Sequence, residues 1–246
     1  MQTDAVEPPR QSKDESGRAV CRPAVCPEHV IALRYGAPVL RLLFVRHGQS
    51  EWNALGRWQG QADPPLSDLG RVQARLAADG ITAAAARSAS PVAGIVTSTL
   101  VRALETATII SDALQIYPVH LEADLVERDA GEWSGLTRDE IDQRFPGYLA
   151  NGSRPSGYEA DDAMLKRTLR AVDHIIRRFA HLDGPATVVV ITHGGVIYTL
   201  ESHLGAPFQR KPNLGARCFL VRDGTLQIST ALTLVDAQAT TVPDLL

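Results

Sequence analysis

The hydrophobic and polar positions of the chain form short apolar runs that alternate with stretches of helical spacing, from residue 38 to about residue 234. Continuous apolar runs bounded by polar or glycine residues predict strands, and an unbroken run such as 186–191 is typical of a parallel sheet. Asp223-Gly224 favours a tight hairpin between the last two runs. The predicted strands cover residues 39–45, 94–98, 186–191, 218–221 and 226–231.

Apolar residues spaced three and four apart predict helices between these strands. Ser67 is a suitable N-cap for the first helix, and the alanine-rich residues 83–89 prolong that helix or form its exit. Thr137 to Glu140 form a capping box, and Pro146 ends the helix that the box begins. A further helix follows Gly195. The expected inward faces are Leu69, Val72 and Leu76; Val101, Leu104, Ala107 and Leu114; and Leu165, Leu169, Val172, Ile176 and Phe179.

The alternation of strands and helices predicts one α/β domain with a mostly parallel central sheet. We assign this domain to residues 38–234. Residues 1–37 carry prolines and balanced charges with almost no periodic apolar pattern, which indicates a flexible N-terminal extension. Residues 235–246 form a C-terminal tail in this division of the chain.

Composition and charge argue against several functional classes. The chain has 246 residues, 44% of them apolar, and a formal net charge of −3. These values fit a globular domain and give no reason to expect nucleic acid or an anionic membrane as a partner. The apolar runs are too short to span a bilayer. No basic start is followed by an apolar segment, so we expect no secretory signal and a cytoplasmic location. The oligomeric state stays open, with a dimer as one alternative.

The three cysteines are too few for a disulfide framework. Cys21 and Cys26 are spaced too widely for the usual metal or redox pair, and His29 is the only histidine near them. A zinc site there is therefore a weak alternative. Cys218 lies in a predicted strand and is expected in the core. The sequence predicts neither a bound metal nor a cofactor.

Charged side chains follow three of the predicted strands. Arg46 and His47 come directly after the first strand, Arg102 follows the second, and His193 follows the long apolar one. If these strands are parallel neighbours, their ends meet at one edge of the sheet. Two arginines and two histidines repel each other, and guanidinium donors match the oxygens of a phosphate dianion in pairs. Taken singly, Arg102 fits a surface helix and His193 a buried structural histidine; together the four residues indicate a phosphate site.

Four segments of the chain combine charged residues with glycine, serine or threonine, namely Arg46 to Asn53, Ser98 to Ala107, Glu127 to Gly135 and Thr192 to Gly195. In this order they resemble motifs of the histidine phosphatase superfamily, which includes the cofactor-dependent phosphoglycerate mutases. Thr99 departs from the family, which usually has proline there. The resemblance covers residues 40 to about 232 and implies a three-layer α/β sandwich, with helices on both faces of a mostly parallel sheet. The resemblance also implies substrate contacts from Asn53, Gln59, Gly60 and Gly194.

The residue types fit phosphoryl transfer without a metal. A neutral imidazole, with an ordinary pKa of about 6.5, can attack phosphorus, so His47 is the expected nucleophile and would carry a phosphohistidine. A backbone carbonyl would fix its tautomer. Glu127 is the expected proton donor, because a dianionic ester beside it favours its protonated form. The expected ligands of the phosphoryl oxygens are Arg46, Arg102 and His193. Asp124, Asp129 and Glu132 are alternatives for the proton donor.

Two other classes of function compete with this interpretation. A zinc hydrolase would use two histidines and a glutamate, but Arg46 and Arg102 would repel the cation. In addition, no two histidines have the helical spacing of the common zinc motif. A catalytically silent module that binds phosphorylated ligands would be indicated by the loss of a catalytic residue. All five expected catalytic residues are present, so we expect an enzyme, a phosphoric monoester hydrolase.

Such a site can return the phosphoryl group to a substrate, as in phosphoglycerate mutases, or give it to water. The mutases resemble one another in a long insertion between the acid motif and the last histidine. Here residues 134–192 are largely filled by two predicted helices and a short loop at 151–155, which leaves little for a water-excluding lid. We therefore expect a phosphatase that hydrolyses the phosphomonoester of a small metabolite, with mutase-type phosphotransfer as the alternative. Candidate rim residues are Trp52, Arg57, Trp58, Gln61, Tyr148, Arg154 and Lys211.

Overall fold

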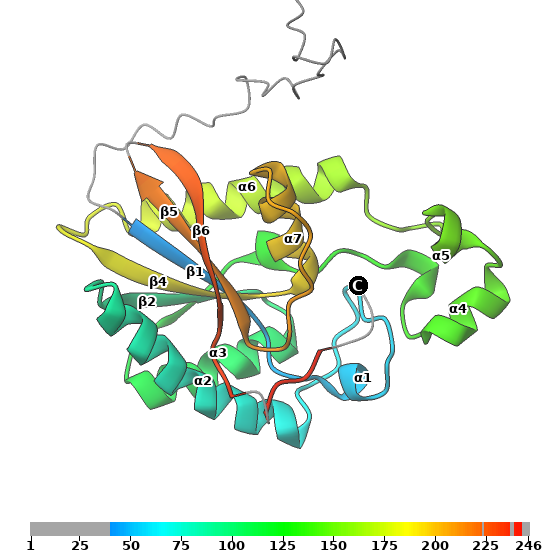
Figure 1. Cartoon of the computed structure of the whole chain (residues 1–246), viewed down its shortest axis with the longest axis horizontal. Coiled ribbons are helices and arrows are strands. Elements are labelled where there is room, and N and C mark those ends of the chain that lie inside the picture. Colours follow the sequence, from blue (N-terminus) through cyan, green and yellow to red (C-terminus); the bar gives the residue numbers. More distant parts are fainter. Residues whose placement is uncertain (1–39, 223, 237–238, 243–246) are drawn as a thin grey trace, which may run out of the picture. The chain divides into compact units, whose positions relative to one another are not determined.

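The computed structural model describes residues 40–222, 224–236 and 239–242. Within these residues, six strands form one mixed sheet that helices cover on both faces (Figure 1). The strands are β1 Leu40–Arg46, β2 Val92–Thr97, β3 Val119–Leu121, β4 Ala186–Thr192, β5 Gly215–Arg222 and β6 Thr225–Thr233. The helices are α1 Glu51–Ala54, α2 Asp68–Arg87, α3 Val101–Leu114, α4 Arg138–Arg144, α5 Tyr148–Asn151, α6 Asp161–Arg178 and α7 Gly194–His203.

The sheet has the order β3-β2-β4-β1-β5-β6, in which the first four strands are parallel and β5 pairs antiparallel with both β1 and β6. The register places Arg46 of β1 opposite Thr192 of β4, and Thr97 of β2 opposite Ile191. The carboxyl ends of β1, β4 and β2 therefore lie side by side, as the sequence predicted. The predicted α/β class and mostly parallel sheet are confirmed. The three-residue β3 was not predicted, because so short a strand has no periodic signal.

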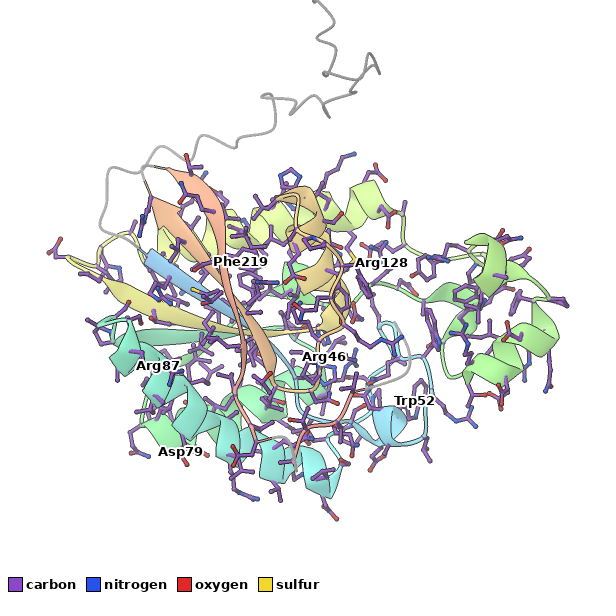
Figure 2. All side chains as sticks on the ribbon, viewed as in Figure 1. Arg46, Trp52, Asp79, Arg87, Arg128 and Phe219 are labelled. Carbon is purple, nitrogen blue, oxygen red and sulfur yellow. The ribbon has the colours of Figure 1, made fainter. Side chains whose placement is uncertain are left out.

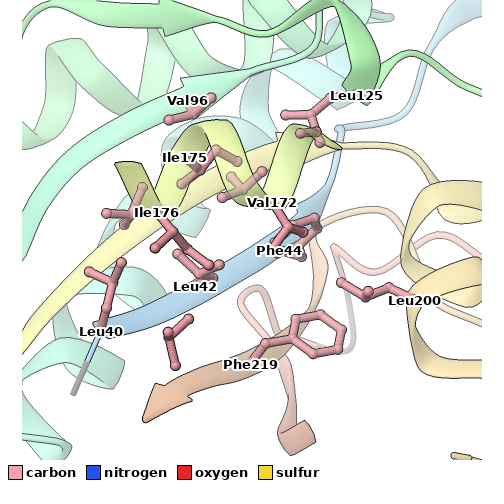
Figure 3. Close-up of a cluster of buried hydrophobic side chains, with 14 of the residues drawn as sticks. Leu40, Leu42, Phe44, Val96, Leu125, Val172, Ile175, Ile176, Leu200 and Phe219 are labelled. Atoms are coloured by element: carbon pink, nitrogen blue, oxygen red, sulfur yellow. The ribbon is translucent and has the colours of Figure 1, made fainter. Parts of the chain in front are cut away.

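Alternate residues of β1 enter two apolar cores, one on each face of the sheet. Leu42 and Phe44 pack with Val172 and Ile176 of α6 (Figure 3). On the opposite face, the residues of β1 that point the other way pack against α2 and α3. Figure 1 shows α2 and α3 on one side of the sheet and α6 and α7 on the other, which confirms the predicted three layers.

The predicted inward face of α2 is wrong. Leu69, Val72 and Leu76 are 40%, 45% and 43% exposed, whereas the helix buries a face of small residues that includes Gly70 and Ala77. A Cβ atom at Gly70 would lie 2.0 Å from the carbonyl oxygen of Gln49, so the helix backbone packs directly on the loop after β1. The close approach of the two backbones requires small side chains on this face of α2. This requirement outweighs the preference of the larger apolar residues of α2 for burial.

Other helix faces are rotated by a smaller amount. In α3, Ala107 is buried, while Val101, Leu104 and Leu114 are only half-buried because the helix turns Arg102 inward. Of the inward residues predicted for α6 and its C-cap, Val172, Ile176 and Phe179 are buried. Leu165 and Leu169 are half-buried. The predicted N-cap of α2 at Ser67, the capping box of α4 and the buried position of Cys218 are confirmed.

Chain segments after the last strand also contact the domain. Leu234 and Val235 are buried, and the hydroxyl of Thr241 donates to Oδ1 of Asn213 over 2.8 Å. Of the sequence predictions, those on residues 1–37, including Cys21, Cys26 and His29, and on Asp223 in the hairpin turn lie outside the described residues. In the described part of the chain, no helix is long and apolar enough to cross a membrane.

Candidate active site

A pocket of about 470 Å³ lies at the carboxyl edge of the parallel strands. The backbone N–H of His47 donates to the carbonyl of Thr192 over 2.9 Å, and that of Ser98 donates to the carbonyl of Ile191 over 2.9 Å. These bonds extend the ladder past the strand ends, so the residues that follow β1, β2 and β4 are held together. Of the predicted site residues, Arg46, His47, Asn53, Gln59, Gly60, Arg102 and Glu127 line the pocket.

The imidazole of His47 is buried and has a defined tautomer. Its Nδ1 lies 2.6 Å from the carbonyl of Gly48, which can only accept, so Nδ1 carries the proton. Nε2 accepts a hydrogen bond from Nε of Arg102 over 3.3 Å. Burial, followed by the charges of Arg102 and Arg46, lowers the pKa of His47 well below its ordinary value of 6.5. His47 is therefore neutral, and its Nε2 carries no proton and accepts from Arg102 at the edge of the pocket.

Arg102 is a fully buried cation bound to backbone carbonyls. Its two Nη groups donate to the carbonyls of Ala62 and Gly60 over 2.7 and 2.8 Å. Gly60 has a φ of 53°, and a Cβ there would lie 2.6 Å from the backbone nitrogen of Ala130, so the loop requires glycine. Burial lowers the pKa of Arg102 to about 10, which leaves it charged at neutral pH.

Arg46 lines the inner end of the pocket beside His47, and His193 lies next to the ring of His47. Nη1 of Arg46 donates to the carbonyl of Lys211 over 2.7 Å, and Nε2 of His193 lies 2.8 Å from the hydroxyl of Ser98. Nε of Arg46 and Nδ1 of His193 are buried without a hydrogen-bond partner among the described residues. The rings of His47 and His193 are 5.2 Å apart. Unpartnered buried donors are costly, so this arrangement favours an anion with several oxygens.

Glu127 faces the same space from the loop that follows residues 123–125. Its carboxylate accepts from the backbone N–H of Arg128 over 2.7 Å and from that of Gly195 over 3.2 Å. A Cβ at Gly195 would lie 2.2 Å from Oε1 of Glu127, so glycine there makes room for the carboxylate. The other candidate carboxylates, Asp124, Asp129 and Glu132, are not among the residues that line the pocket.

Three of the four predicted substrate contacts line the pocket, namely Asn53, Gln59 and Gly60. Oε1 of Gln59 accepts from Ser50, and Oδ1 of Asn53 accepts from Nδ2 of Asn213. Asn213 also donates to the carbonyl of His47 over 3.0 Å and was not found from the sequence, because a lone asparagine in a loop carries no motif. Gly194 and His193 are not among the residues that line the pocket.

Arg167 of α6 is a second residue that the sequence interpretation missed. It is buried, and its side chain forms an ion pair with Glu159. It also donates to the carbonyls of Asp124, Val126 and Glu127. The signal was present, because position 167 falls one turn before Ala171 on the buried face of a helix interpreted only as core packing.

The outer end of the pocket is lined by the cations Arg57, Arg128 and Arg154 and by the rings of Trp58 and Tyr158. Figure 2 labels Arg128 and, at the inner end, Arg46. Arg57 pairs with Glu140 and Arg128 with Asp161, over 2.9 and 2.7 Å. The guanidinium of Arg154 lies over the ring of Tyr158, 5.2 Å from its centroid, and has no carboxylate within 4.0 Å among the described residues.

Three of the seven predicted rim residues line the pocket, namely Arg57, Trp58 and Arg154. Lys211 is wrong as a rim residue: it is 3% exposed, and its ammonium group pairs with Glu201 over 3.0 Å inside the protein. Its backbone, not its side chain, serves the site, because its carbonyl accepts from Arg46. Trp52, Gln61 and Tyr148 are not among the residues that line the pocket.

Residues 42–217 match the family model of the histidine phosphatase superfamily (branch 1). The chain belongs to this superfamily. It is 39% identical over 188 residues to a glucosyl-3-phosphoglycerate phosphatase of Mycolicibacterium vanbaalenii, covering 72% of this chain and 80% of the relative. It is 33% identical over 166 residues to a metal-independent phosphoserine phosphatase of Arabidopsis thaliana, covering 65% of this chain and 66% of the relative.

Among solved structures, the mycobacterial glucosyl-3-phosphoglycerate phosphatase in complex with VO3 superposes with a TM-score of 0.65. The two chains are 28% identical, and the match covers 77% of this chain and 96% of the other. The predicted family, its fold and the assignment as a phosphoric monoester hydrolase are confirmed by these relatives.

Proposed function

We propose that this histidine phosphatase hydrolyses the phosphomonoester of a small metabolite through a phosphohistidine on His47. The observation that carries the proposal is the state of Nε2 of His47, an unprotonated nitrogen at a pocket lined by two buried arginines. A nucleophile must be deprotonated, and a phosphate dianion must be held by donors that water does not compete with. This end of the pocket supplies both conditions.

In the first step Nε2 of His47 attacks phosphorus, the N–P bond forms, and the bond from phosphorus to the ester oxygen breaks. Arg46, Arg102 and His193 bind the three remaining oxygens, on which negative charge spreads in the loose transition state. Glu127 gives its proton to the leaving oxygen. In the second step Glu127 takes a proton from water, which attacks phosphorus and breaks the N–P bond. Phosphate leaves and His47 is again neutral.

Two observations support hydrolysis over return of the phosphoryl group to a second substrate. Both relatives described above are named as phosphatases. In addition, the interval 134–192 is taken up by α4, α5, α6, β4 and their connections, which leaves no long insertion in it; its residues 154, 158, 161 and 165 line the pocket. The neighbouring arginines support chemistry without a metal, because they would repel a cation at the reacting group. A cytoplasmic location and the division into residues 1–37, 38–234 and 235–246 stay predictions.

The test is to trap the phosphoenzyme with ³²P-labelled phosphomonoesters under alkaline quench, across sugar phosphates, phosphoglycerates, nucleotides and phosphoamino acids. We expect His47→Ala to abolish labelling and to lower phosphate release by at least roughly 10⁴-fold, the scale seen when a nucleophile is removed. His181→Ala, an exposed histidine outside the pocket, is the matched control and should change neither. Activity that survives His47→Ala, or that a chelator removes, would refute the mechanism. Phosphoryl transfer to a second substrate in excess of phosphate release would establish a mutase.

A further inference from the structure

The side chain of Arg167 uses all five of its N–H groups inside the protein. Nε and Nη2 donate to the two carboxylate oxygens of Glu159, each over 2.7 Å. Nη1 donates to the carbonyls of Asp124 and Val126 over 2.9 and 2.5 Å, and Nη2 donates to the carbonyl of Glu127 over 3.1 Å. One guanidinium thus binds three of four successive carbonyls in the segment that ends at Glu127.

Other contacts also hold this segment: the hydroxyl of Thr192 donates to the carbonyl of Leu125 over 2.9 Å, and Arg170 binds the side chain of Asp124. Residues 123–125 form a single 3₁₀ turn, and residues 126–129 have no regular secondary structure. The carbonyl of Glu127 has one further donor, the exposed side chain of Gln61 over 3.2 Å, and its carboxylate is bound by the backbone N–H of Gly195. Contacts at its carboxylate and at its backbone carbonyl therefore place the Glu127 side chain, and Arg167 supplies the buried donor to the carbonyl.

Glu159 in turn fixes Arg167. Its carboxylate also lies 3.3 Å from the backbone N–H of Asp129, and its own N–H donates to the carbonyl of Asp129 over 3.0 Å. The residues before and after Glu127 are thereby bound to one ion pair. Packing alone does not require this pair, because an apolar side chain fills a buried helix position without the desolvation cost of a guanidinium and a carboxylate.

We propose that Arg167 is a positioning residue that, clamped by Glu159, holds Glu127 at the leaving oxygen of the substrate. The proposal rests on the proposed function, in which Glu127 is the proton donor. Arg167 touches no substrate; it acts by fixing the direction of the backbone from which the donor extends. Proton transfer requires hydrogen-bond distance between donor and acceptor, so a relaxed backbone reduces this transfer and leaves phosphate binding intact.

Leaving-group dependence tests this role, because it separates a misplaced acid from general damage. An alkyl phosphate needs a proton on its leaving oxygen, whereas p-nitrophenolate leaves as a stabilised anion. For Arg167→Lys we expect kcat to fall about 10- to 100-fold on an alkyl phosphate and about threefold or less on p-nitrophenyl phosphate, a part of the roughly 10²- to 10⁴-fold that a positioned acid supplies. Binding of inorganic phosphate should not change.

The matched control is Arg170→Lys, the same substitution on the same helix at an exposed arginine that pairs with the side chain of Asp124. It should leave both substrates at wild-type rates. Glu159→Gln removes the charge that holds Arg167 and keeps Arg167 itself. We expect kcat to fall more on the alkyl phosphate than on p-nitrophenyl phosphate, by a smaller factor than in Arg167→Lys. Glu127→Gln gives the reference pattern for complete loss of the acid.

The outcomes separate the two hypotheses. Equal losses on both substrates in Arg167→Lys and Glu159→Gln, with a selective loss in Glu127→Gln, would overturn the positioning role and leave the function standing. A Glu127→Gln variant without selective loss would overturn the assignment of the acid, and the role of Arg167 with it. A selective loss in all three variants, absent in Arg170→Lys, supports both. If Arg167→Lys does not fold, Glu159→Gln alone decides between these patterns.

Discussion

The pocket holds Arg102 at its inner end and Arg57 and Arg128 at its outer end in opposite ways. At the inner end, Arg102 is fully buried and binds only uncharged partners, the carbonyls of Gly60 and Ala62 and the ring of His47. At the outer end, Arg57 and Arg128 are paired with the carboxylates of Glu140 and Asp161. An exposed ion pair contributes about 0–1 kcal/mol, whereas a desolvated, unbalanced cation interacts strongly with any anion that enters. The proposed reaction uses the inner end, where Arg102 is desolvated and has no ion-pair partner among the described residues.

Replacing one arginine at each end of the pocket by a neutral residue tests this difference most directly. We expect Arg102→Met to lower kcat/KM by roughly 10²- to 10³-fold, because a preorganised donor to the transition-state oxygens is lost. Arg57→Met, which removes an already paired cation, should lower it by about threefold or less, in keeping with an exposed ion pair. Steady-state kinetics on one phosphomonoester gives both values. Similar losses in the two variants would contradict the difference between the ends.

Gly195→Ala perturbs the inner end without changing its charge. A Cβ would lie 2.2 Å from Oε1 of Glu127, so the carboxylate must move, and we expect kcat to fall about tenfold or more through impaired proton transfer, with KM nearly constant. The effect should be absent when Gly195→Ala is combined with Glu127→Gln, because two changes acting through one group are not additive. Additive losses in the double variant would show that the methyl group acts elsewhere.

Arg154→Gln tests whether the outer end of the pocket binds a second acidic group of the substrate. Its guanidinium is held over Tyr158 and has no carboxylate partner among the described residues, so it can bind a second acidic group of the substrate. We expect KM for phosphomonoesters with such a group to rise about three- to fivefold, the scale of one exposed charge pair, with kcat unchanged and no effect on phenyl phosphate. Arg138→Gln, exposed on α4 and outside the pocket, is the control. A fall in kcat would place Arg154 in the reaction instead.

The smallest effect concerns stability and pH. Burial first, and then the neighbouring arginines, lower the pKa values of His47 and His193 well below 6.5. As the pH falls below 6.5 these groups bind protons in the unfolded chain and not in the folded one, so the stability they contribute, present above that pH, is lost. In phosphate-free buffer, the unfolding free energy of the wild type should fall more steeply than that of His47→Gln, by up to about 1.4 kcal/mol per pH unit. Identical slopes between pH 7 and 5 would show that folding does not lower the pKa of His47.

The inner end was predictable from the sequence because its residues follow strands. Apolar runs predict parallel strands, and the carboxyl ends of parallel strands share one edge of the sheet. The sequence therefore predicts that Arg46, His47 and His193 lie close together. Arg102 needed the additional step that its helix starts at that edge. None of these inferences requires the direction of a side chain.

The sequence pattern does not predict the buried face of a helix or the position of a side chain where a contact between distant parts of the backbone determines it. The buried face of α2 follows from Gly70 lying against Gln49, and the pattern of Leu69, Val72 and Leu76 contradicts it. Lys211 was expected at the rim as a cation, and its pairing with Glu201 becomes visible only after α7 and the following loop are placed. Hydrophobic periodicity describes which residues prefer burial; it does not describe which backbones touch.

The hydrogen bond from Nδ1 of His47 to the carbonyl of Gly48 has a consequence for the identity of the covalent adduct. A ring nitrogen that carries a proton and faces a carbonyl cannot accept a phosphoryl group, so only Nε2 can be modified. In the proposed reaction the adduct is therefore the tele isomer, 3-phosphohistidine, and never the pros isomer. Antibodies that discriminate the two isomers should stain the trapped enzyme with one specificity alone.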